Sequence, residues 1–186
     1  MANTYTQDKT FGQVDYLPKG EYDNCIFNNC NFAQQDLSDF KFVDCLFNAC
    51  DLSLAKLSYT LFRDVKFKDC KLLGLQFDSC DPLGLSFLFD GCLLNHSSFY
   101  KTKIKKTLFK NCQLQEVDFS EADLSGAVFD HCNLAQAAFD RTLLERADFR
   151  TAHSYSIYPE SNRIKKAKFS ILGVSGLLQK YNIEIE

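Results

Sequence analysis

The sequence predicts an all-β fold, a quadrilateral parallel β-helix, from three observations. First, the chain from Gly20 onward reads in blocks of five residues, each with Phe or Leu at its centre and a small or apolar residue two positions earlier. Second, all nine cysteines occupy that earlier position. Third, cysteines recur at steps of 20, 20, 22, 20 and 20 residues from Cys30 to Cys132. Five residues are too few for an independent strand or helix, so each block forms one side of a larger coil.

Four blocks therefore make one turn, and equivalent residues of successive turns stack in columns. One column holds Phe27, Phe47, Phe67, Phe89, Phe109, Phe129 and Phe149. Two apolar positions separated by a polar one point to the same side of a short extended segment, which places the cysteines and the central residues inside. The step of 22 marks a two-residue insertion within 81–85, where Pro82 takes a central position and cannot donate to a ladder. We expect a local bulge there, too short for a functional loop.

The inward position also decides how the cysteines are interpreted. Cys25 and Cys30, like Cys45 and Cys50, have a spacing seen in thiolate metal sites. However, Ala and Val take the same position in other blocks, and free cysteine packs as a small buried hydrophobe. We therefore expect nine free thiols, no metal and no cofactor. We expect no catalytic residue either, since His131 faces outward beside the inward Cys132 and His96 and His153 have no evident carboxylate partner.

The ends of the chain lose the five-residue pattern. Residues 1–19 are expected to cap the first coil of a repeat region at 20–151, with Phe11 and Tyr16 as apolar plugs. Residues 152–186 are expected to cap the last coil, with one repeat-like block at 167–171, a short C-terminal helix and a strand-like tail at 182–186. This segment either caps the rod alone or also forms a homodimer through Leu172, Val174, Leu177, Leu178, Tyr181, Ile183 and Ile185.

Charge and composition narrow the partners. The net charge is −3 at pH 7, which argues against direct nucleic-acid binding, and no stretch is apolar enough to span a membrane. Unpaired cysteines and the lack of a signal-peptide core predict a cytoplasmic protein.

The acidic residues fall into two sets. Six aspartates precede central residues, where a carboxylate satisfies backbone groups at the turn: Asp36, Asp51, Asp81, Asp118, Asp123 and Asp148. The other acids form a candidate partner-binding surface: Asp39, Asp44, Asp64, Asp69, Asp78, Asp90, Glu116, Glu121, Asp130, Asp140 and Glu145.

Between two acidic regions lies a basic stretch, residues 101–110, with Lys101, Lys103, Lys105, Lys106 and Lys110. Lysines on an exposed sheet face protect it from aggregation, and they could instead contact a partner. The stretch interrupts the negative surface.

The repeat resembles the pentapeptide-repeat family over about residues 20–151. The clearest matches to its Ala-Asp/Asn-Leu consensus are the blocks 122–126, 132–136 and 147–151. The resemblance implies a right-handed coil. The C-terminal segment LLQKYNIEI resembles the module through which the quinolone-resistance (Qnr-type) members dimerise. The resemblance to the Qnr-type members implies a non-enzymatic protein that mimics duplex DNA. Such a protein binds a type II topoisomerase, DNA gyrase or topoisomerase IV, and protects it from quinolones. Qnr-type members often carry larger projecting loops than the insertion here. The alternative is a protein-interaction scaffold with another partner.

Overall fold

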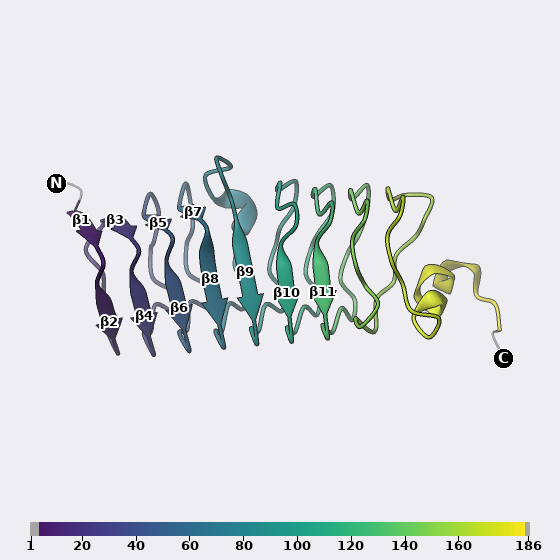
Figure 1. Ribbon diagram of the computed structural model, residues 1–186, viewed down its shortest axis with the longest axis horizontal. Helices are drawn as coiled ribbons and strands as arrows, with labels where there is room; N and C mark the ends of the chain where they lie inside the picture. The colour runs from purple at the N-terminus through teal and green to yellow at the C-terminus, as the bar shows by residue number, and fades with distance from the viewer. Residues whose placement is uncertain (1–3, 185–186) are drawn as a thin grey trace.

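The computed structural model describes residues 4–184 and shows a rod of stacked coils with the termini at opposite ends (Figure 1). Four strands form one parallel sheet: β1 (Thr4–Gln7), β3 (Gly20–Asp23), β5 (Lys41–Val43) and β7 (Leu61–Arg63). Seven form a second parallel sheet: β2 (Thr10–Gly12), β4 (Ile26–Asn28), β6 (Leu46–Asn48), β8 (Val65–Lys68), β9 (Phe87–Asp90), β10 (Leu108–Lys110) and β11 (Val128–Asp130). The expected parallel β-solenoid is confirmed.

Backbone pairing fixes the turn length at twenty residues. Phe27 pairs with Phe47, and Phe109 pairs with Phe129. Single bridges such as Asn31 with Asp51 keep the same step outside the strands. We number the four sides by their central residues. The first side is centred on the Phe27 column. The second side is centred on Phe32, Leu52, Leu72, Leu94, Leu114 and Leu134, and the third on Leu37, Leu57, Phe77, Phe99, Phe119 and Phe139. The fourth side is centred on Tyr22, Phe42, Phe62, Ile104, Leu124, Leu144 and Ile164.

Aromatic rings fill the interior. Phe109 is fully buried, with ring centroids 5.2 Å from Phe89 and 5.0 Å from Phe129 in stacked geometry. It also meets Phe119 edge to face at 5.9 Å. Such pairs contribute roughly 0.5–1.5 kcal/mol each beyond the area they bury. The sequence dictates this core because a bulky residue returns to the same inward position every twenty residues.

The insertion lies where the spacing predicts it. Val65 of β8 pairs with Phe87 of β9, an offset of 22 residues, whereas neighbouring strands are offset by twenty. The extra residues form the 81–86 loop, which projects beside β9 in Figure 1 and follows a 3-10 turn, η1 (Phe77–Ser79). The Asp81 carboxylate accepts the Leu83 N–H at 2.9 Å, and the Leu83 side chain is exposed.

The solenoid is longer at both ends than the predicted 20–151. At the start, β1 and β2 pair with β3 and β4, and the Phe11 ring stacks on Phe27 at 5.1 Å. Residues 4–12 thus cover the first coil by adding strands to it. Phe11 plugs the end as expected, but Tyr16 is exposed and the prediction for it is wrong. At the other end, Lys168 bridges Asp148, which confirms the returning block.

The predicted C-terminal helix is wrong in type. Residues 174–181 form two 3-10 turns, η2 (Val174–Leu177) and η3 (Gln179–Tyr181), not an α-helix. Gly176 is pressed against Tyr155, where an added Cβ would lie 2.4 Å from the Tyr155 carbonyl oxygen. Asn182 then ends the turns in the left-handed conformation. Tight contact and two glycines favour short turns over a regular helix. Residues 182–184 form no strand, and the rest of the predicted tail lies outside the described residues.

Within residues 4–184, no helix has the length and apolar character needed to cross a membrane.

Candidate interaction surfaces

The cysteine side chains lie inside the rod, as predicted. All nine are free and buried. The Cys50 Sγ lies 3.2 Å from the Phe27 carbonyl oxygen of the preceding coil, and 3.4 Å from that of Asn48. Burial raises the pKa of the Cys45 thiol to about 12 and also raises that of Cys80. A protonated, enclosed thiol is a poor nucleophile, so Cys45 and Cys80 serve packing. Among residues 4–184, no cluster of His, Cys, Asp or Glu is suited to hold a metal ion.

The six aspartates assigned to turns have that role. Each accepts a hydrogen bond from the backbone N–H two residues later, as Asp118 does from Ser120 at 2.8 Å and Asp51 from Ser53 at 2.9 Å. The remaining four make the same bond over 2.9 to 3.2 Å: Asp36, Asp81, Asp123 and Asp148. At Asp148, the hydrogen bonds from Arg150 lower the carboxyl pKa below its usual range.

The backbone conformation at the corners of the coil explains why several of the other acidic residues stand where they do. The last residue of nearly every block is left-handed, as at Asp39 (φ 61°) and Asp64 (φ 53°). Asp and Asn tolerate this conformation better than most residues. Six of the eleven candidate acids occupy such corners: Asp39, Asp44, Asp64, Asp69, Glu116 and Glu121. This backbone role is not evident from the residue types, which give the charge at each corner but not its φ.

The eleven acids do not form one stripe. They fall on all four sides of the rod, and the third side carries four of them. The third side carries Asp39, Asp78, Glu121 and Asp140. The first side carries Asp69, Asp90 and Asp130, the second carries Glu116, and the fourth carries Asp44, Asp64 and Glu145. With Asp36, Asp118 and Glu160, the third side holds seven acids and only three bases, Lys56, Lys101 and Arg141.

Many of these acids are paired with a base, most often one coil away. Lys19 lies 2.8 Å from Asp39, and Arg141 lies 3.1 Å from Glu121. Asp90, Glu116, Asp130 and Asp140 also have partners within 4.0 Å. The partner of Glu116 is His96, so the expectation that His96 lacks a carboxylate neighbour is wrong. Exposed pairs of this kind contribute about 0–1 kcal/mol each, but they reduce the local negative field.

The C-terminal cap presents apolar side chains to solvent. Leu172 is 94% exposed, and Val174, Tyr181 and Ile183 are also exposed. Ile171, which lies outside the predicted interface set, is 93% exposed. Leu177 instead packs against the core, and Leu178 is half-buried. Ile185 lies outside the described residues. The cap thus exposes five apolar side chains, and proteins commonly bury such surface against a partner.

Comparison with known proteins decides the family. The protein-family model described as the pentapeptide repeat region matches this sequence at residues 21–88 and 86–153. This chain belongs to the pentapeptide-repeat family. No curated protein matches it in sequence.

Solved structures of QnrB1 share its fold over nearly the whole length of both chains. A trypsin-treated variant of QnrB1, a plasmid-mediated fluoroquinolone resistance protein, is 18% identical, covers 99% of this chain and 98% of its own, and has a TM-score of 0.51. A second treated QnrB1 variant is also 18% identical, covers 100% of both chains and scores 0.50. HetL of the cyanobacterium Nostoc, involved in heterocyst differentiation regulation, is 15% identical over 88% of this chain and 84% of its own, with a score of 0.42.

This pentapeptide-repeat rod has one pronounced irregularity along its length, the 81–86 loop. The loop leaves a pocket of about 350 Å³ between itself and the next coil, lined in part by Phe77, Leu83, Leu85 and Tyr100. The four-stranded sheet of β1, β3, β5 and β7 ends just before this loop. The insertion therefore interrupts the fourth side, while the sheet on the first side passes through it intact.

Proposed function

We propose that this protein is a non-catalytic interaction rod that mimics duplex DNA and binds a type II topoisomerase, DNA gyrase or topoisomerase IV. The observation that carries the proposal is the acidic third side, where seven acids outnumber three bases along the rod. A net anionic surface complements the basic surface that such an enzyme offers to DNA. The similarity to QnrB1 in fold supports the choice of partner. Binding would modulate the enzyme or protect it from quinolones, in the cytoplasm, where thiols stay reduced.

We further propose that the protein is a homodimer through its C-terminal cap. The exposure of five apolar side chains in the cap supports this, since a second copy would remove them from water: Ile171, Leu172, Val174, Tyr181 and Ile183. Light scattering should give twice the chain mass, and Leu172→Glu should give the single-chain mass. Leu83→Glu is the matched control, because Leu83 is also strongly exposed but lies on the 81–86 loop. A full-length chain that is monomeric at high concentration refutes the dimer.

The topoisomerase proposal is tested by DNA supercoiling with purified gyrase, with and without this protein and a fluoroquinolone. We expect inhibition at high protein concentration, rescue from the drug, or both. Neutralising the third side should abolish the effect, with the variant Asp39→Asn, Asp78→Asn and Asp140→Asn. The control removes three acids from other sides, Asp44→Asn, Asp64→Asn and Asp69→Asn. Asn suits the four of these positions that are left-handed corners, Asp39, Asp44, Asp64 and Asp69, since Asn already occupies such corners elsewhere on the rod. No effect of the wild-type protein on gyrase or topoisomerase IV refutes the proposal.

The second candidate is a scaffold for another protein. The pairing of acids with bases favours it, because six of the eleven candidate acids have a basic neighbour within 4.0 Å. A surface of mixed sign fits a protein partner of mixed sign better than a DNA-binding saddle. In that case the protein leaves supercoiling unchanged at every concentration, and the third-side variant behaves like its control.

A further inference from the structure

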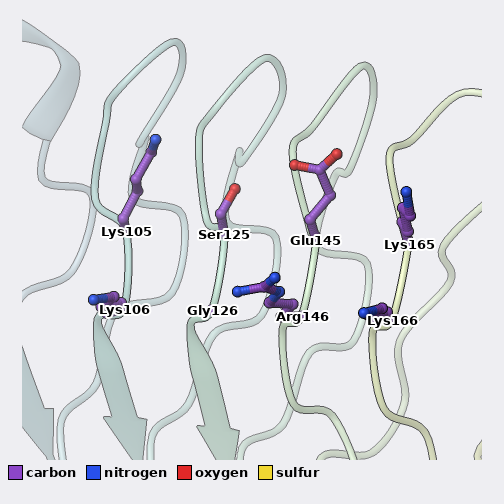
Figure 2. A pocket seen from close by; sticks show the side chains of 8 residues that line it. All are labelled: Lys105, Lys106, Ser125, Gly126, Glu145, Arg146, Lys165 and Lys166. Atoms are coloured by element: carbon purple, nitrogen blue, oxygen red, sulfur yellow. The ribbon is translucent and has the colours of Figure 1, made fainter.

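A basic groove runs along the fourth side of the rod near its C-terminal end. It has a volume of about 470 Å³, and Figure 2 shows its side chains in two rows that follow the stacked coils. Lys105, Glu145 and Lys165 belong to one row, and Lys106, Arg146 and Lys166 to the other. We call these six residues and the space between them the basic groove. It lies on a different side from the acidic face of the proposed function.

Among the residues that the structure describes, four of the five cations of the groove lack the carboxylate partner that several other cations of the rod have. Lys41 pairs with Glu21 and Lys110 with Asp90, in each case across one coil. In the groove, only Lys105 has such a partner, Asp123 at 3.1 Å. Within residues 4–184, the carboxylates lie farther than 4.0 Å from the other four: Lys106, Arg146, Lys165 and Lys166. Lys103 and Arg163 on the same side are likewise unpaired.

This arrangement costs stability. Arg146 and Lys166 hold equivalent corner positions in successive coils, about 4.8 Å apart along the rod. Like charges directly opposite each other on neighbouring strands are destabilising. An acid at either position would pair with its neighbour, as Glu121 pairs with Arg141 on the third side. Residue choices that lower stability without a compensating contact are typical of functional positions.

Gly126 keeps the middle of the groove open. It occupies the corner between Lys106 and Arg146 with φ +73°. Other corners hold ordinary side chains at similar φ, such as Gln34 and Gln136, so the conformation alone does not require glycine. A side chain here would stand in the space toward which Arg146 points in Figure 2. The missing side chain thus leaves room for a bound group among the cations.

The lining restricts the ligand. The backbone N–H groups of Lys106, Gly126 and Arg146 already bond to the next coil at 2.8 to 3.0 Å, so an extended peptide cannot add as a strand. No aromatic residue lines the groove, so bases of single-stranded nucleic acid would find no stacking platform. What remains is a short line of positive charge, which fits a chain of closely spaced anions. We propose that the basic groove binds a linear chain of phosphate groups, with inorganic polyphosphate as its simplest form.

The test is a titration of full-length protein into a fluorescently labelled linear polyphosphate, followed by anisotropy. The variant Lys106→Gln, Arg146→Gln and Lys166→Gln should weaken binding at least about tenfold at low salt, because three phosphate contacts are lost. The matched control removes one Arg and two Lys that are also exposed and unpaired, with Arg63→Gln, Lys66→Gln and Lys68→Gln. It should stay within about twofold of wild type. Glu145→Gln should tighten binding, since it removes the one carboxylate of the groove.

A second variant separates shape from charge. Gly126→Gln fills the groove without changing any charge, and glutamine occupies the same corner at Gln34 and Gln136. It should weaken binding several-fold. The midpoint of urea unfolding should fall only modestly, because the left-handed φ of +73° strains any side chain and an added Cβ lies 3.4 Å from the Lys106 Cγ. Equal weakening in the control, an unaffected Gly126→Gln variant, or orthophosphate competing at the same phosphate concentration would overturn the proposal. Tighter binding of an acidic peptide or of single-stranded DNA of equal charge would overturn the ligand class.

Discussion

Replacing Cys50 tests whether the thiol column is a packing column. The side chain is 1% exposed, and its sulfur contacts backbone carbonyls of two coils. Cys50→Ala removes a single buried atom of about the size of a methylene group, so we expect a loss of about 1 kcal/mol, with a small cavity term added. Alanine already fills the same position at Ala122 and Ala127, both fully buried. The coil should therefore accept it.

Cys50→Arg should prevent folding. An unpaired charge in a dry interior costs several kcal/mol, comparable with the roughly 5–15 kcal/mol stability of a whole domain. The matched control is Ala49→Arg, one residue earlier. Ala49 is exposed at a left-handed corner, and Arg141 and Arg146 already occupy such corners. That control should stay within about 0.5 kcal/mol of wild type.

The assay is urea unfolding followed by circular dichroism, with the slope of the transition used to check that the same surface is exposed. The expected order of stability is wild type, Ala49→Arg, Cys50→Ala and then an unfolded Cys50→Arg. Equal midpoints for the two arginine variants would refute the assignment of inward and outward positions. A metal that stabilises wild type and not Cys50→Ala would refute the packing role.

Two further predictions concern the ends of the rod. Gly20→Ala should release β1, because an added Cβ would lie 2.0 Å from the Thr4 carbonyl oxygen. The release should appear as faster hydrogen exchange of the amides in residues 4–7. Gly12→Ala is the control and should leave this exchange unchanged, because a Cβ added at Gly12 meets open space. At the other end, hydrogen bonds from Tyr181 and Lys180 lower the pKa of Glu160 from 4.5 to about 2. This contact stabilises the cap above the ordinary pKa and is lost as pH falls toward 2. Protection of the cap amides, taken as the intrinsic exchange rate at each pH divided by the observed rate, should therefore fall over that window in wild type but not in Glu160→Gln. Constant protection from about pH 5 to pH 2 would contradict it.

Much of the fold follows from the sequence because the structure repeats. The position of Phe109 is fixed by the same residue type twenty positions earlier and later, so each coil confirms the next. The place of the insertion follows from the one step of 22 residues. The turn role of Asp118 follows from the short reach of a carboxylate to the N–H two residues on.

The sequence did not predict what depends on neighbours across coils or on irregular ends. Glu121 looked like free negative charge, and only the stacking shows Lys101 and Arg141 beside it. The spacing of Val174 and Leu177 suits a helix, and only the packing of Gly176 on Tyr155 favours short turns.

The coil, its period and the inward position of the thiols could therefore be predicted from the residues alone, because these features depend on a local alternation repeated many times. Which charges meet and which remain unpaired, as in the basic groove, depends on how the coils stack. Charges interact through space over a few ångströms, and residues twenty apart in the chain come within that distance only when the coils stack.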